Sequence, residues 1–138
     1  MSLIDTKEWY MIADDDLYAA KLLNEAYRKP LEIIVYHCAQ ATEKYLKGYL
    51  VYNGIIPQKT HDLKALQAKC FSMDTTFKDI KQQCEFLNNY STDTRYPYGP
   101  ELTEDLVNFA IKSTEKVKNF EAFQKIRAEI NNLDSTNP

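Results

Sequence analysis

The sequence is poor in residues that interrupt regular backbone structure, with 3 glycines and 5 prolines among its 138 residues. Its three cysteines, Cys38, Cys70 and Cys84, are odd in number and lack paired close spacing. This pattern argues against a disulfide framework and predicts a reducing, cytoplasmic setting. Charged residues interrupt every apolar run before about 18 residues, so neither a signal peptide nor a membrane-spanning helix is predicted.

Positive charge is also scarce, because 17 Lys and Arg residues face 20 Asp and Glu residues and give a formal net charge of -3. General attraction to nucleic acid or to an anionic membrane is therefore not expected, and any anion site must be local. Glycine occurs only at positions 48, 54 and 99, which excludes a glycine-rich phosphate loop. The two histidines, His37 and His61, have no close set of Asp or Glu ligands, so we predict no metal site.

The alternating pattern of β-strands is missing, since apolar residues recur at every third or fourth position instead. Segments with this helical spacing cover residues 5–27, 30–52, 75–90 and 101–130, and a short helix follows His61. They predict an all-α fold, an antiparallel up-and-down bundle of four main helices plus one short helix. No linker divides the chain, so we expect a single domain over residues 1–130 and a frayed C-terminal tail over 131–138.

One acidic residue of the first segment interrupts its apolar face. Asp16 falls in the middle of a stripe that runs from Trp9 through Ile12 to Tyr27. Removing a carboxylate from water costs several kcal/mol, so an inward Asp16 needs a cation or several hydrogen-bond donors as partners. Losing the partner of a buried carboxylate destabilises the fold by about 3 to 5 kcal/mol. In the alternative, the helix is rotated and Asp16 lies at the boundary of the buried face, beside solvated Asp14 and Asp15.

The second segment carries a polar stripe beside a broad apolar face, at spacings of three, four and seven: Gln40, Glu43, Lys44 and Lys47. Its members could pair with Asp16, or the stripe could simply face solvent, with Glu43 and Lys47 as an ordinary helix-stabilising pair. Two small residues at the edge of the stripe, Ala41 and Gly48, would let another helix approach closely.

The segment STDTRYPYGP at 91–100 places Arg95 in a stiff, aromatic connection. A guanidinium is a rigid fork that suits a carboxylate or a phosphate, and Tyr96 could stack on a base. His61, at the start of the short helix, could hydrogen-bond locally or act in proton transfer.

Four segments together resemble the HEPN domain, the helical domain of higher eukaryotes and prokaryotes that is linked to nucleotide binding. They are DDDLYAAKLL at 14–23, HCAQATEKYLKGYLVYNG at 37–54, KTHDLKAL at 59–66 and YSTDTRYP at 90–97. The resemblance covers about residues 5 to 125. It implies an antiparallel helical bundle that commonly forms homodimers, often beside a minimal nucleotidyltransferase, in toxin–antitoxin-like pairs.

In relatives that cut RNA, an arginine at the start of the last helical hairpin is followed within four to six residues by a histidine. Arg95 matches this arginine, but residues 96–102 contain no histidine. The resemblance therefore argues against catalysis and assigns no catalytic residue, because the usual proton-transfer group is absent.

Three hypotheses follow from the sequence. The first is a non-catalytic dimer that binds a nucleotide or RNA phosphate, with no other cofactor, through Asp16, Gln40, Lys44, Lys47, Arg95 and Tyr96. The second is a metal-independent, toxin-like ribonuclease in which His61 transfers the proton. The third is an interaction module in which Asp16 and Arg95 form a buried structural pair.

Overall fold

The computed structural model describes residues 2–92 and 101–135, and in these ranges all regular secondary structure is helical. The elements are α1 (Ser2–Leu23), α2 (Leu31–Tyr52), α3 (Leu63–Met73), the 3-10 helix η1 (Thr75–Ile80), α4 (Lys81–Asn88), α5 (Glu104–Lys118) and α6 (Glu121–Ser135). The all-α prediction is therefore confirmed. None of the described helices has the length and apolar character that crossing a bilayer requires.

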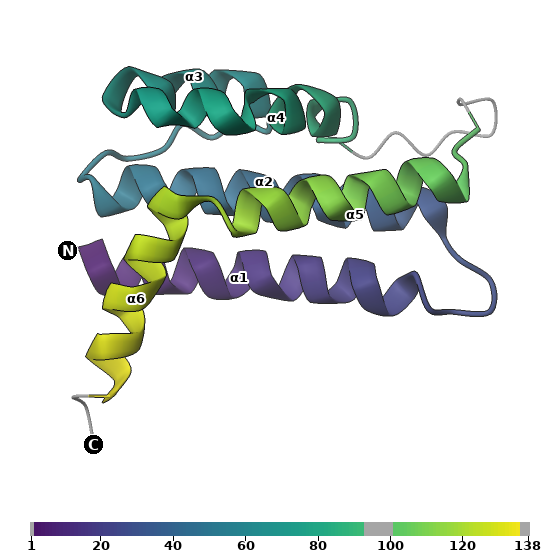
Figure 1. Cartoon of the computed structure of the whole chain (residues 1–138), viewed down its shortest axis with the longest axis horizontal. Coiled ribbons are helices and arrows are strands. Elements are labelled where there is room, and N and C mark those ends of the chain that lie inside the picture. Colours follow the sequence, from purple (N-terminus) through teal and green to yellow (C-terminus); the bar gives the residue numbers. More distant parts are fainter. Residues whose placement is uncertain (1, 93–100, 136–138) are drawn as a thin grey trace.

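Helix α2 is the centre of the molecule, because it contacts α1, α3, α4 and α5. Figure 1 shows α1 and α2 as an antiparallel hairpin, with α5 beside them running in the same direction as α2. Helices α3 and α4 form a second layer over α2, and α6 crosses α1 near the N-terminal end (Figure 1). Burial on several sides explains why nearly the whole of α2 is inaccessible to solvent from Ile34 to Leu50.

The predicted helix over 101–130 is two helices that meet at a sharp turn. The α5 helix ends where Phe120 N donates to Val117 O at 3.0 Å, a tightened last turn. Gln124 Nε2 donates to Lys118 O at 2.8 Å, so a carbonyl left free by the break is satisfied. The turn lets both Phe120 and Phe123 enter the core. Helix α6 then continues to Ser135, into the range expected to be a tail.

The segment predicted as one helix over 75–90 begins as a 3-10 helix. Asp74 accepts from Thr76 N at 2.9 Å and so caps the N-terminus of this helix. The 3-10 turn ends at Ile80, and α4 follows directly. The short helix α3 is capped by Asp62, which accepts from Lys64 N and Ala65 N at 3.0 and 3.2 Å. Because Asp62 is the cap, His61 lies directly before the N-terminus of α3.

Helix α1 is rotated relative to the stripe expected from its sequence. Its buried face consists of Thr6, Tyr10, Ala13, Leu17 and Ala20. Ile12 is instead 50 % exposed, and Tyr27 lies beyond the helix in full contact with solvent. The expected stripe also included Ala13, Leu17 and Ala20, which are buried, so the expected face was right in part and is displaced by part of a turn.

Tyr10 explains this rotation, because its ring lies where α1 and α2 approach most closely. The ring packs edge-on against Tyr45 and Phe123, with centroids 5.7 and 6.1 Å away. A Cβ atom added at Gly48 would lie 2.7 Å from Tyr10 Cε1 and 3.1 Å from Trp9 Cβ. Only glycine leaves room for the ring at this crossing, so the predicted role of Gly48 in close helix approach is confirmed.

The three cysteines are free thiols inside the core. Burial raises the pKa of Cys38 from its ordinary value of 9.0 to about 12, and burial raises those of Cys70 and Cys84 to about 12 as well. Because the thiolate is the reactive form, these residues are packing groups and not nucleophiles at neutral pH.

We expect Gly48→Ala to lower the free energy of unfolding by about 1 to 3 kcal/mol, because the new methyl group displaces a ring that is packed on every side. Urea denaturation followed by circular dichroism measures the change. Glu32→Ala is the matched control on the same helix, since Glu32 is exposed. An unchanged stability of Gly48→Ala would contradict the close packing described for this crossing.

Candidate functional site

Polar side chains gather on one side of α2, in a group that we call the α2 polar cluster: Asp16, His37, Gln40, Glu43, Lys44, Lys47 and His61. Asp16 comes from α1, His61 from the loop before α3, and the others from α2. The cluster contains most of the residues that the sequence singled out, and hydrogen bonds or ion pairs join its members. It is the candidate site.

Asp16 lies at the boundary of the buried face, with its side chain 19 % exposed. Its carboxylate contacts His37 Nδ1 at 3.0 Å and lies 3.8 Å from Lys44 Nζ. The boundary alternative therefore describes its position, and the expectation of a cationic partner is also met.

Glu43 is the most deeply buried charged residue of the cluster, with 2 % of its surface exposed. One carboxylate oxygen binds Lys47 Nζ at 2.9 Å and the other binds His61 Nδ1 at 2.8 Å. Lys47 is itself only 7 % exposed, and its ammonium lies 5.9 Å from the centre of the Trp9 ring. The expectation that this pair faces solvent was wrong, because α1 covers the stripe through Trp9.

Gln40 links the cluster to the end of α4. Its amide oxygen accepts from Lys44 Nζ at 2.8 Å, and its Nε2 donates to Ser91 O at 3.4 Å. Ser91 lies four residues before Arg95 in the sequence. Arg95 and Tyr96 themselves fall outside the described residues, so their assigned places in the site stay predictions.

The two lysines do not share one anion site. Glu43 binds the Lys47 ammonium in the interior, whereas the Lys44 ammonium lies between Gln40 and Asp16. Lys44 is the lysine with access to solvent, because 18 % of its side chain is exposed against 9 % for Lys47. Lys47 therefore has a supporting position as the buried ion-pair partner of Glu43.

In each histidine–carboxylate pair of the cluster, the ring is more exposed than the carboxylate. The side chains of Glu43 and Asp16 are 3 % and 19 % exposed, whereas those of His61 and His37 are 57 % and 29 % exposed. A carboxylate accepts hydrogen bonds, so the Nδ1 atom of each ring donates to its partner and Nε2 is the other ring nitrogen. The outward surface consequently offers ring nitrogens and the Lys44 ammonium, with the Asp16 carboxylate exposed to the same extent as Lys44.

A second polar group, which the sequence did not indicate, joins α6 to α1. Arg127 donates to both oxygens of Asp14, at 2.9 Å each, and Tyr45 donates to the same carboxylate at 2.5 Å. The Arg127 guanidinium also lies 5.6 Å from the centre of the Tyr10 ring. Asp14 was expected to be solvated, and this was wrong.

The Asp14 group has a structural role. Burial raises the pKa of Tyr45, and its hydrogen bond to Asp14 raises it further. The phenol therefore stays protonated and keeps donating to Asp14 throughout the neutral range. No local sequence pattern pairs Asp14 with Arg127, because the two residues are 113 positions apart.

No metal centre is indicated by the described part of the chain. In residues 2–92 and 101–135, no group of three or more His, Cys, Asp or Glu side chains is placed to hold a metal ion.

The fold and the cluster define an all-helical domain whose central helix carries a buried polar site. The family model for the HEPN domain matches residues 6–126. The chain belongs to the HEPN family, and the resemblance found in its sequence segments is confirmed. Searches of curated proteins and of solved structures found no match.

We expect Glu43→Ala to lower the free energy of unfolding by about 3 to 5 kcal/mol, because it leaves the Lys47 ammonium buried without its counter-charge. Urea denaturation monitored by circular dichroism gives the value. Asp79→Ala, at an exposed carboxylate on η1, should change stability by less than about 0.5 kcal/mol. Equal, small effects of the two substitutions would show that Glu43 does not hold the cluster together.

Proposed function

We propose that the protein is a HEPN-type binding module that holds a phosphate group of a nucleotide or an RNA at the α2 polar cluster. One observation carries the proposal: Glu43 lies inside, whereas His37, Lys44 and His61 reach solvent, with Asp16 as the partly exposed carboxylate beside them. An anion that approaches the cluster meets the Lys44 ammonium and the two rings, each of which donates from Nε2 when it carries a second proton. This local arrangement matters because the whole chain has a net charge of -3.

The hydrogen bonds within the cluster support binding by fixing its donors in advance. His61 is held by Glu43 at 2.8 Å, and His37 is held by Asp16 at 3.0 Å. Side chains that are already oriented lose less conformational entropy when a ligand binds. In this proposal, Lys44 and the histidines contact the phosphate, while Glu43 orients the donors.

Arg95 and Tyr96 complete the proposed site. The chain enters their segment just after Ser91, whose carbonyl accepts from Gln40 Nε2 at 3.4 Å. The start of the segment is thereby tied to α2 beside Lys44. A guanidinium there would bind phosphate through two parallel hydrogen bonds, and a tyrosine ring would stack on the base.

Membership of the family supports two further parts of the proposal. We propose that the module acts as a homodimer in the cytoplasm and that it works beside a nucleotidyltransferase-type partner. Light scattering of the purified chain gives its mass in solution and tests the first part. Copurification with a candidate nucleotidyltransferase tests the second.

We expect AMP, ATP or a short single-stranded RNA to raise the midpoint of thermal unfolding by several degrees when present at about 100 times the dissociation constant. Arg95→Ala and Lys44→Gln should each remove most of the shift, because each loses a phosphate contact. Lys125→Gln is the control, since Lys125 lies on α6 with its side chain 75 % exposed. A ligand-induced shift that survives both substitutions would contradict the proposed site.

A ribonuclease is the second candidate function, and the His61–Glu43 pair favours it. A carboxylate on one ring nitrogen orients the imidazole and leaves the other nitrogen for proton transfer. Incubating the short RNA with the protein, in the presence of EDTA to remove metal ions, distinguishes the two functions. Cleavage that is lost in His61→Gln would establish the ribonuclease, whereas intact RNA with a thermal shift supports binding alone.

A further inference from the structure

A groove of about 450 Å³ lies between α3 and the η1–α4 segment, and its lining is distinct from the α2 polar cluster. Ala68 and Phe71 of α3 supply apolar surface, and Cys84 of α4 lies buried beneath the groove. Phe71 is 39 % exposed. An aromatic ring that is exposed inside a concave surface is a common feature of binding sites.

Three lysines border the groove, Lys64 on α3, Lys78 on η1 and Lys81 on α4. One carboxylate, Glu85, accompanies them, 3.9 Å from Lys81 Nζ. The side chains of this pair are 62 % and 47 % exposed, so solvent weakens their attraction. Among the described residues, Lys64 and Lys78 have no carboxylate partner. The groove is thus locally positive in a chain of negative net charge.

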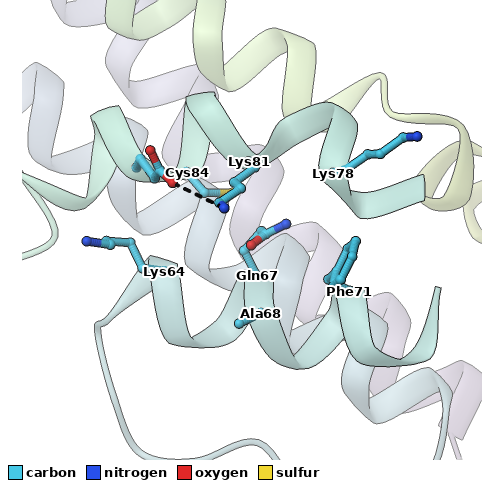
Figure 2. Close-up of a pocket in the computed structure, with 8 residues that line it drawn as sticks. Lys64, Gln67, Ala68, Phe71, Lys78, Lys81 and Cys84 are labelled. Carbon is cyan, nitrogen blue, oxygen red and sulfur yellow. Dashed lines mark ion pairs between the residues drawn. The ribbon is translucent and has the colours of Figure 1, made fainter. Parts of the chain in front are cut away.

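The lysines are spread along the groove. Figure 2 shows Lys64 and Lys78 at opposite ends, with their ammonium groups directed away from each other, and Lys81 between them. A compact ligand cannot reach both ends at once. The arrangement instead suits an elongated ligand that carries negative charges at intervals along its length.

The lining of the groove favours a peptide over a nucleic acid. Single strands of RNA are bound by stacking successive bases on several aromatic rings, and among the described residues Phe71 is the one ring that lines this groove. Gln67, whose amide group could read the edge of a base, donates its Nε2 hydrogen to Phe77 O at 2.9 Å. Aliphatic side chains match the surface between Ala68 and Cys84 better than bases do.

We infer that this groove binds an amphipathic helical segment of a partner protein, with apolar side chains on Phe71 and Ala68 and flanking Asp or Glu residues paired with the three lysines. Two packed helices present a groove into which the side-chain ridge of a third helix fits. Apolar anchors with helical spacing and complementary charges at the edges are the usual requirements of this binding mode. The site is independent of the phosphate site proposed above.

The test is a selection from a display library of helix-forming peptides in which acidic, basic and apolar residues vary freely. Selected peptides are titrated against the wild-type chain and against the triple variant Lys64→Gln, Lys78→Gln, Lys81→Gln. The charge-matched control is Lys112→Gln, Lys116→Gln, Lys125→Gln, which alters three exposed lysines elsewhere. Phe71→Ser tests the apolar contact, with Met11→Ser, at an exposed methionine on α1, as its control.

We expect the selected peptides to carry Asp or Glu beside apolar residues at helical spacing and to lose at least about 10-fold in affinity with the triple variant and with Phe71→Ser. Both controls should bind like the wild type, and circular dichroism should show all variants folded. Peptides without acidic residues, or peptides that bind all variants equally, would overturn the inference. An 8-nucleotide RNA provides one more test. If the groove variants weaken binding of this RNA but leave the binding of every acidic peptide unchanged, the inference is overturned too.

Discussion

The buried carboxylate of Glu43 is the constraint on which the α2 polar cluster depends. A charge that is 2 % exposed must be compensated at both oxygens, and Lys47 and His61 meet this requirement from two directions. Lys47 in turn needs the cover that Trp9 of α1 provides. One ionised group therefore couples the packing of α1 on α2 to the position of the loop before α3.

The contact between Gly48 and Tyr10 determines which residues of α1 face this cluster. Because the Tyr10 ring enters the core at Gly48, α1 is rotated so that its two flanks carry different carboxylates. Asp16 lies on the flank beside His37 and Lys44. Asp14 lies within reach of Arg127 and holds α6 in place. The packing of one glycine thus separates the carboxylate of the α2 polar cluster from the carboxylate that binds Arg127.

The sequence was sufficient to predict most of the helical segments and the polar stripe on α2, because these depend on local spacing. It was not sufficient for the rotation of α1, since Trp9 and Tyr10 are both aromatic and either could have faced inward. The turn between α5 and α6 was missed because no proline or glycine marks it, and aromatic packing of Phe120 and Phe123 favours it instead. Contacts between residues that are distant in the sequence, such as Asp14 with Arg127, could not be predicted because no local sequence pattern marks them.

The central claim is that Glu43 and Lys47 form one buried, energetically coupled unit beneath the proposed phosphate site. A double-mutant cycle with Glu43→Gln and Lys47→Met, measured by urea denaturation, tests it most directly. We predict a coupling free energy of about 1 to 3 kcal/mol, because removing either partner leaves the other charge buried. Effects that add to within about 0.5 kcal/mol would contradict the claim.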